Sequence, residues 1–193
     1  QDAVPAGVGA MAAIMGAPDD DAVIAACAEA AQGQIVEAVN FNAPGQLVIA
    51  GHREAVERAI AVAKTKGAKR GVILPVSAPF HSSLLRPAAL RLAERLAKIT
   101  MTAPAIAVLH NVDVLMHDSP DAIRHALAQQ AAHPVRWTAT MQAMGAQGIT
   151  HVVECGPGKV LAGLAKRSVD SVRAYSLTDG ESLAATLAEL AAA

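Results

Sequence analysis

The first third of the chain changes between two hydrophobic periods. Residues 9–15 form a continuous apolar run, which is typical of a buried strand. Asp19, Asp20 and Asp21 then precede apolar positions at helical spacing, and acidic residues are favoured in the first turn of a helix. The pattern therefore predicts a strand over residues 9–15 and a helix that begins at these aspartates and ends near Gln32-Gly33.

Two strands, a second helix and a fourth strand follow. They are predicted over residues 35–41 and 46–50, residues 53–66, and residues 71–76. The turn Asn42-Ala43-Pro44-Gly45 joins the first two strands into a hairpin, and we expect it to be longer than two residues. The resulting order, β-α-β-β-α-β, is the ferredoxin-like pattern. Residues 6–77 are therefore predicted to form a ferredoxin-like small subdomain.

The rest of the chain alternates helices with short strands. Helices are predicted over residues 83–98, from Ser119-Pro120-Asp121 to His133-Pro134, through Trp137 and Met144 to Gly148, from Gly158 onward and at the C-terminus. Short strands are predicted over residues 105–109, 151–154 and 173–177. The first of these strands is expected to be buried. Such alternation favours a parallel sheet covered by helices, so residues 78–193 are predicted to form a second α/β domain. Three strands are too few for an ordinary doubly wound domain, and we expect further chain to complete the sheet.

Composition and charge narrow the classes of function. The chain has 193 residues, of which 53% are hydrophobic, so it can bury a real core. Its net charge of −1 does not indicate binding to nucleic acid or to an anionic membrane. No apolar run approaches the ~20 residues of a membrane span. Cys27 and Cys155 are not placed to pair, so we expect two buried, free thiols in a reducing compartment, the cytoplasm.

A candidate general base lies in the segment Leu-Pro-Val-Ser-Ala-Pro-Phe-His-Ser-Ser-Leu, residues 74–84. His81 stands between an apolar run and a predicted helix, and an imidazole titrates near neutral pH, as general acid-base work requires. The chain contains no G-x-S-x-G elbow and neither cysteine has an activating neighbour, so His81 is half of a catalytic pair. The alternative is a partly exposed histidine at a helix start. No histidines show metal-ligand spacing, and no metal site is expected.

Five motifs occur in an order that is specific to one family. They are Val4-Pro5 with Gly9-Ala10-Met11-Ala12-Ala13-Ile14, Val39-Asn40-Phe41-Asn42-Ala43-Pro44-Gly45-Gln46 with Val48-Ile49-Ala50-Gly51, Pro79-Phe80-His81-Ser82, His133-Pro134-Val135-Arg136-Trp137, and Glu154-Cys155-Gly156-Pro157-Gly158-Lys159-Val160-Leu161. On these motifs the chain resembles the C-terminal portion of the malonyl-CoA:acyl-carrier-protein transacylase family of bacterial fatty-acid synthesis, with its relatives in polyketide synthases. The family's Gly-Gln-Gly oxyanion loop, G-H-S-x-G nucleophile elbow and malonyl-binding arginine would precede Gln1, so we expect a missing N-terminal segment.

The resemblance implies a fold, a reaction and partners. The fold is α/β, with a ferredoxin-like small subdomain (βαββαβ) and the C-terminal part of an α/β-hydrolase-like parallel-sheet domain. A serine and a histidine transfer the malonyl group from malonyl-CoA to the phosphopantetheine thiol of acyl carrier protein by a ping-pong mechanism that uses no cofactor. His81 matches the histidine of this dyad, and Gln130 falls where a backbone carbonyl orients the imidazole. The chain then supplies the histidine half, and by itself it is expected to be inactive.

Three more residues are candidates for substrate binding. Phe80 resembles the aromatic residue of the malonyl-selective motif, whose ring excludes the extra methyl group of methylmalonyl; the alternative is a phenylalanine of the core. Asn40 and Asn42 flank Phe41 in a predicted strand, so alternation points both amides to one side. The resemblance implies that this side faces the active site, whereas the alternative is that residues 42–45 merely form a good turn.

Two features are given structural roles. Gly156-Pro157-Gly158 lacks a Walker pattern and is interpreted as a strand-to-helix turn. Trp137 is expected to anchor the core with its indole N–H bonded to a carbonyl.

Two alternatives to fatty-acid malonyl transfer stay open. They are a non-catalytic ferredoxin-like binding module and an acyltransferase of polyketide synthesis.

Overall fold

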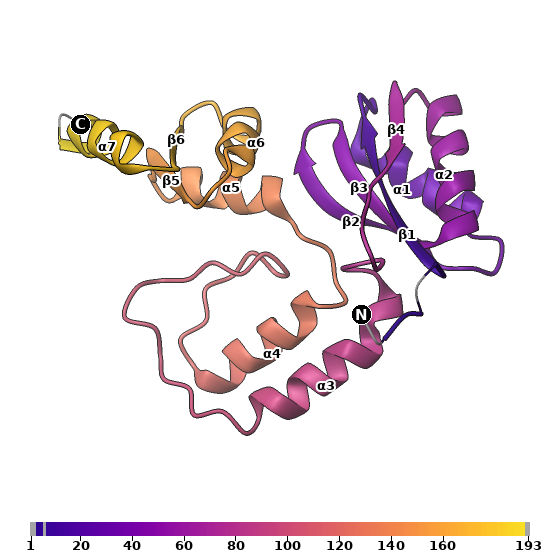
Figure 1. Ribbon diagram of the computed structural model, residues 1–193, viewed down its shortest axis with the longest axis horizontal. Coiled ribbons are helices and arrows are strands. Elements are labelled where there is room, and N and C mark those ends of the chain that lie inside the picture. The colour runs from indigo at the N-terminus through magenta and orange to yellow at the C-terminus, as the bar shows by residue number, and fades with distance from the viewer. Residues whose placement is uncertain (1–2, 6, 192–193) are drawn as a thin grey trace. The chain divides into compact units, whose positions relative to one another are not determined.

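The chain folds into two units in a computed structural model, Gln1–Trp137 and Thr138–Ala193 (Figure 1). The structure describes residues 3–5 and 7–191. The predicted start of the small subdomain at residue 6 therefore lies outside the described residues. The domain boundary predicted between residues 77 and 78 stays a prediction. Each unit mixes helices with strands, which confirms the α/β class.

The first unit begins with a four-stranded sheet covered on one face by two helices. Its elements are β1 (Gly9–Met15), α1 (Asp20–Ala31), β2 (Val36–Ala43), β3 (Gln46–His52), α2 (Arg53–Thr65) and β4 (Arg70–Ile73). The strand order is β2-β3-β1-β4, and all three neighbouring pairs are antiparallel. The β-α-β-β-α-β order predicted from the hydrophobic pattern is confirmed.

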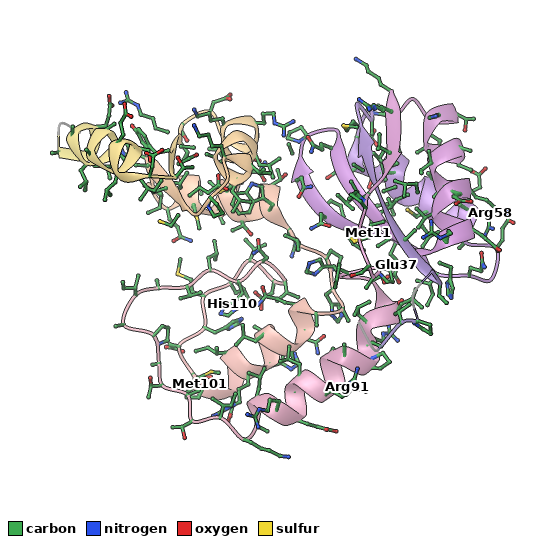
Figure 2. All side chains as sticks on the ribbon, in the orientation of Figure 1. Met11, Glu37, Arg58, Arg91, Met101 and His110 are labelled. Carbon is green, nitrogen blue, oxygen red and sulfur yellow. The ribbon has the colours of Figure 1, made fainter. Side chains whose placement is uncertain are left out.

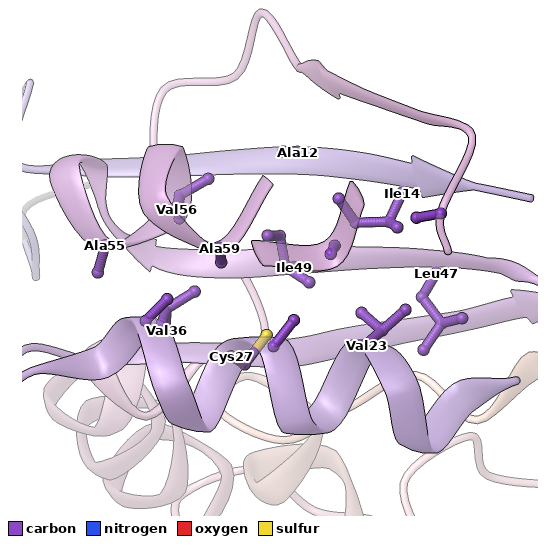
Figure 3. Close-up of a cluster of buried hydrophobic side chains, with 14 of the residues drawn as sticks. Ala12, Ile14, Val23, Cys27, Val36, Leu47, Ile49, Ala55, Val56 and Ala59 are labelled. Carbon is purple, nitrogen blue, oxygen red and sulfur yellow. The ribbon is translucent and has the colours of Figure 1, made fainter. Parts of the chain in front are cut away.

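The main core of this unit lies between the sheet and the two helices (Figure 3). Val23 and Cys27 of α1 face Ile14, Leu47 and Ile49 of the sheet, and all five side chains are buried. The aspartates before α1 act as predicted, since the Asp19 carboxylate accepts the N–H of Ala22 at the first turn. The opposite face of the sheet carries no helix in this segment, and it holds a smaller cluster of Met11, Val39, Val48 and Ala50.

The hairpin between β2 and β3 is tighter than predicted. Its connection is only Pro44-Gly45, because β2 continues to Ala43, which pairs with Gln46. Gly45 has a φ of 68°, and a Cβ atom there would come within 2.7 Å of the Ala17 carbonyl oxygen. A glycine at this position lets two residues make the reversal, which explains why the longer predicted turn is wrong.

Three helical segments complete the first unit. They are η1 (Ser83–Leu85, a 3₁₀ turn), α3 (Arg86–Leu96) and α4 (Pro120–Gln130). The single helix predicted over residues 83–98 is divided at its start because Pro87 has no N–H with which to continue an α-helical ladder. The buried strand predicted over residues 105–109 is wrong. Ile106 is 82% exposed, and within this segment only an isolated bridge from Leu109 to Met116 is seen among the described residues.

The second unit is built on two parallel strands. Its elements are β5 (His151–Cys155), α6 (Val160–Ser168), β6 (Arg173–Leu177) and α7 (Gly180–Ala191), after α5 (Trp137–Ala146), which begins at the last residue of the first unit. β5 and β6 pair in parallel from His151↔Arg173 to Cys155↔Leu177, as the alternating pattern predicts. The Glu154 carboxylate accepts the N–H of Ala162 in α6, so the glycine-rich segment between them joins a strand to a helix.

The two cysteines differ in environment. Cys27 is buried as predicted, and burial, followed by the nearby Glu37 charge, raises the pKa of its thiol to about 12. Cys155 is exposed, so the expectation of a second buried thiol is wrong. It ends β5 in a two-stranded sheet, where the described residues provide no third strand to cover it. Within the described residues, no helix combines the length and the apolar character needed to span a membrane.

Candidate active site

A tight turn after β4 presents His81. Pro79 packs where a side chain on Gly9 would otherwise lie, since a Cβ atom on Gly9 would come within 2.5 Å of the Pro79 ring. The carbonyl oxygen of Pro79 accepts the hydroxyl of Ser82 at 2.6 Å, and Ser82 is fully buried. His81 lies between them with a φ of 63°, a left-handed conformation that a histidine adopts only in special turns.

The imidazole of His81 is oriented by a backbone carbonyl. Its Nδ1 lies 2.8 Å from the carbonyl oxygen of Gln130. A carbonyl has no hydrogen to donate, so Nδ1 must carry the proton. In the neutral ring this leaves the lone pair on Nε2, which is the state that a general base requires. The two residues that the sequence analysis assigned to this pair are thus in contact, and their role in catalysis stays a prediction.

Gln130 offers its carbonyl because α4 ends there. The last four carbonyls of a helix have no partner within the helix, so they are open to other donors. Ser119 caps the other end of α4, as its hydroxyl accepts the N–H of Ala122. Just beyond Gln130, Ala132 packs with Val4 and Leu85 in a small buried cluster. This packing holds the end of α4 beside the segment that follows His81.

The segment after α4 also joins the edge of the four-stranded sheet. The N–H of Val135 donates to the Val39 carbonyl at 2.8 Å, and the N–H of Phe41 donates to the Val135 carbonyl at 2.9 Å. Asn40 lies between these bonds and forms a parallel bridge with Val135. The predicted candidate Asn40 is therefore on the same edge strand that the His133-to-Trp137 motif contacts.

The side chains of β2 sort onto the two faces of the sheet. Phe41 packs with the main core, while Asn40 pairs with Val48, which belongs to the cluster on the face without helices. Asn40 and Phe41 therefore point to opposite faces, as alternation predicts. Asn40 and Asn42 are both half-buried. The register shifts between Phe41 and Ala43, and a role for either amide in substrate binding stays a prediction.

Phe80 lies directly before His81 and is 39% exposed. It is therefore not among the buried residues of the core, which was the alternative to a substrate-facing role. Trp137 departs from expectation, because its buried indole nitrogen has no hydrogen-bond partner among the described residues. The expected bond to a carbonyl is therefore wrong.

Glu37 is the residue of this site that the sequence analysis missed. Its two carboxylate oxygens accept the N–H and the hydroxyl of Ser83, two residues after His81. Figure 2 shows Glu37 near the end of the sheet closest to the start of α3. The available signal was the one charged residue in this strand, since a half-buried carboxylate needs a partner.

Comparison with known proteins identifies the relatives of this chain. The chain is 56% identical over 187 residues to the malonyl CoA-acyl carrier protein transacylase of Escherichia coli strain K12, covering 97% of this chain and 60% of that protein. The transacylase of Bacillus subtilis strain 168 is 38% identical over 182 residues, covering 94% of this chain and 57% of that protein. No family model matches the chain.

Solved structures agree with the sequence comparison. An acyl-carrier-protein S-malonyltransferase from Burkholderia pseudomallei has a TM-score of 0.92 at 56% identity, covering 96% of this chain and 60% of that one. A malonyl-transacylase in complex with a type II polyketide acyl carrier protein has a TM-score of 0.95 at 49% identity, covering 98% and 61%. The chain thus spans about 60% of the length of these relatives, and over that span its resemblance to the malonyl-CoA:acyl-carrier-protein transacylase family is confirmed.

Proposed function

We propose that this chain supplies the general-base half of a malonyl-CoA:acyl-carrier-protein acyltransferase. The observation that carries the proposal is the contact between His81 Nδ1 and the Gln130 carbonyl in a chain that is 56% identical to such an enzyme. This contact fixes the tautomer and leaves Nε2 as the proton acceptor. The nucleophilic serine, the oxyanion donors and the arginine that binds the malonyl carboxylate come from a segment outside these 193 residues.

The reaction proceeds through a malonyl-serine intermediate. His81 Nε2 accepts the serine hydroxyl proton while the serine oxygen attacks the thioester carbonyl of malonyl-CoA. The carbon–sulfur bond breaks, and the imidazolium returns its proton to the leaving thiolate of coenzyme A. The phosphopantetheine thiol of acyl carrier protein then loses its proton to His81 and attacks the malonyl-serine ester. The carbon–oxygen bond to the serine breaks, and the imidazolium returns the proton to the serine oxygen. The Gln130 carbonyl stabilises the imidazolium in both halves, and no cofactor takes part.

The architecture supports an assignment of the chain to two domains. We assign residues 6–77 to a ferredoxin-like small subdomain, which the β2-β3-β1-β4 order of antiparallel strands favours. We assign residues 78–193 to the C-terminal part of an α/β-hydrolase-like domain, whose parallel pairing is represented here by β5 and β6. Asn40 and Asn42 contact the substrate, and Phe80 restricts the acyl pocket.

The acceptor is an acyl carrier protein, and the reaction takes place in the cytoplasm. A carrier protein of polyketide synthesis is the second candidate, because one relative at 49% identity is a malonyl-transacylase in complex with such a protein. Rates of transfer to a fatty-acid carrier and to a polyketide carrier, measured side by side, separate the two.

The test of the proposed function is His81→Ala in the complete enzyme. We expect the rate of acylation by malonyl-CoA to fall by about 10² or more, because a positioned general base typically contributes that much. Stopped-flow or quench-flow measurement of the malonyl-enzyme gives this rate directly. The matched control is His125→Ala, an exposed histidine on α4, which should leave the rate unchanged. An unaffected rate in folded His81→Ala would assign His81 to structure.

A further inference from the structure

We propose that Glu37 is a positioning residue that sets the orientation of His81 by holding Ser83. This proposal rests on the proposed function, because it takes His81 as the general base. The hydrogen bonds of Glu37 within the described residues go to Ser83 and not to His81. Its effect is transmitted through the backbone of the turn that carries the imidazole.

The contacts of Glu37 are two charge-assisted hydrogen bonds to one residue. Oε2 accepts the N–H of Ser83 at 2.7 Å, and Oε1 accepts the Ser83 hydroxyl at 2.8 Å. Ser83 is the first residue of η1, where a backbone N–H has no partner within the helix. Glu37 therefore caps this helical turn from a different element, and a carboxylate is a strong acceptor for that purpose.

Glu37 is itself held rigidly. It lies in β2 opposite Ala50 of β3, within the four-stranded sheet. Val36 before it is buried, and Ala38 after it is half-buried. A carboxylate on a paired strand between packed neighbours has few alternative positions, so it can act as a fixed reference for the turn.

The turn needs such a reference because its conformation is unusual. His81 has a φ of 63°, and residues in this region persist only where their surroundings hold them. The Ser82 hydroxyl donates to the carbonyl of Pro79, which precedes His81. Glu37 accepts the N–H of Ser83, which follows His81. Without Glu37 the second attachment is lost, and His81 can relax to an ordinary backbone conformation. The imidazole then moves away from the Gln130 carbonyl.

The result is a closed set of contacts around the general base. β2 holds Ser83 through Glu37, and the same strand holds Val135 through backbone bonds at Val39 and Phe41. Gln130 lies a few residues before Val135, and its carbonyl oxygen accepts the hydrogen bond from His81 Nδ1. One strand thus places both the residue that follows the imidazole and the helix end that orients it.

The test measures the tautomer of His81 by ¹⁵N NMR on the 193-residue chain. In the unchanged chain we expect the Nδ1–H form, because the Gln130 carbonyl can only accept. Glu37→Ala should shift His81 toward a mixture that includes the Nε2–H form, and Glu37→Gln, which keeps one acceptor oxygen, should restore part of the original signal. The matched control is Glu57→Ala on α2, an exposed glutamate, which should leave the His81 signals unchanged. Circular dichroism verifies that each variant is folded.

A second variant keeps the proposal testable if Glu37→Ala does not fold. Ser83→Ala removes only the hydroxyl contact, and it should shift the tautomer in the same direction by a smaller amount. Unchanged His81 signals in a folded Glu37→Ala, or in Ser83→Ala if the former does not fold, overturn the proposal.

Activity of the complete enzyme distinguishes this proposal from the proposed function. Glu37→Ala should lower kcat roughly tenfold to a hundredfold with little change in KM for malonyl-CoA, because misplacement of a catalytic group acts on the chemical step. Equal kcat values in wild type and folded Glu37→Ala overturn the positioning role. A tautomer shift together with an unaffected rate in His81→Ala supports the contact but refutes the proposed function.

Discussion

At the scale of single residues, His81 combines a chemical requirement with a conformational cost. Its left-handed backbone costs of order 1–3 kcal/mol, which the surrounding contacts must offset. The turn gains the buried hydrogen bond of Ser82 to Pro79 and the contact of the Pro79 ring with Gly9. These contacts flank His81, the residue of this turn that has the left-handed backbone.

Phe80 is the residue at which substrate choice can be tested. Its ring is partly exposed beside His81, so we expect it to act by excluding the methyl group of methylmalonyl-CoA. Phe80→Ser in the complete enzyme should raise the use of methylmalonyl-CoA relative to malonyl-CoA by roughly tenfold, the scale of relieving one methyl clash. Competition between the two substrates, followed by mass spectrometry of the acylated carrier protein, measures this ratio.

Phe80→Tyr keeps the volume of the ring and should retain the preference for malonyl-CoA. If Phe80→Ser lost activity equally toward both substrates, the ring would support His81 by packing and the selectivity role would be wrong.

Sequence reasoning reached His81, Phe80 and Gln130 but not Glu37, and the reason is physical. The first three lie in or follow from motifs that are continuous along the chain or shared with a family. Glu37 gains its significance only from a contact with Ser83, which is 46 residues away in sequence. Local patterns carry no signal for such a pair.

At the scale of elements, the hydrophobic pattern predicted most of the helices and strands and failed where tertiary contacts decide. The first six elements follow their predicted order because amphipathic periods and glycine turns act locally. The predicted strand over residues 105–109 has apolar residues but no pairing partner among the described residues, and a strand needs a neighbour. The β2–β3 turn is short because β2 continues to Ala43, which pairs with Gln46, and this cross-strand contact is not visible in the apolar pattern.

The loop closed by the Leu109–Met116 bridge offers a test of electrostatics at this scale. The Asp113 carboxylate lies 2.7 Å from His117 Nε2 and accepts the Leu115 N–H at 3.1 Å. Partial burial by itself would raise the pKa of Asp113, but these hydrogen bonds outweigh it and hold the pKa below its usual value. The folded loop therefore favours the ionised carboxylate.

Asp113→Asn should reduce stability near neutral pH by no more than about 1 kcal/mol, because the pair is partly exposed. A lowered folded pKa gives a stabilisation that is complete above the unfolded value of about 3.9 and is lost as the pH falls through the folded value. Urea unfolding at several pH values should therefore show the two proteins converging as the pH falls below the unfolded value. Asp118→Asn, an exposed neighbour, is the control. A difference that did not change with pH would place the cause in side-chain geometry instead of charge.

At the scale of the whole molecule, the described residues place no serine or cysteine side chain in hydrogen-bond contact with the proposed general base, His81. Among the described residues, the hydrogen bond of His81 is the one to Gln130, and the chain spans about 60% of its relatives' length. Catalytic groups of this kind act as a unit, so the base alone lowers the barrier little.

We therefore expect the isolated chain to form no covalent malonyl adduct with malonyl-CoA. Intact-mass spectrometry after incubation measures this, with His81→Ala as the control for background acylation of surface amines. An added malonyl group that appears on the wild-type chain and is absent from His81→Ala would contradict the prediction. It would also show that these residues contain a nucleophile of their own.

The pairing of distant segments at the candidate site also has a consequence for the order in which the protein folds. The hairpin of β2 and β3 closes across two residues, whereas the bonds from Ser83 to Glu37 and from His81 to Gln130 span 46 and 49 residues. Closing long loops costs more entropy before any contact compensates it, and chains with distant contacts fold more slowly. The β2–β3 hairpin can thus form first, whereas the pairing of β1 with β4 and the contact of the imidazole with its carbonyl both close long loops, so a refolding chain forms its hairpin before it orients the proposed general base.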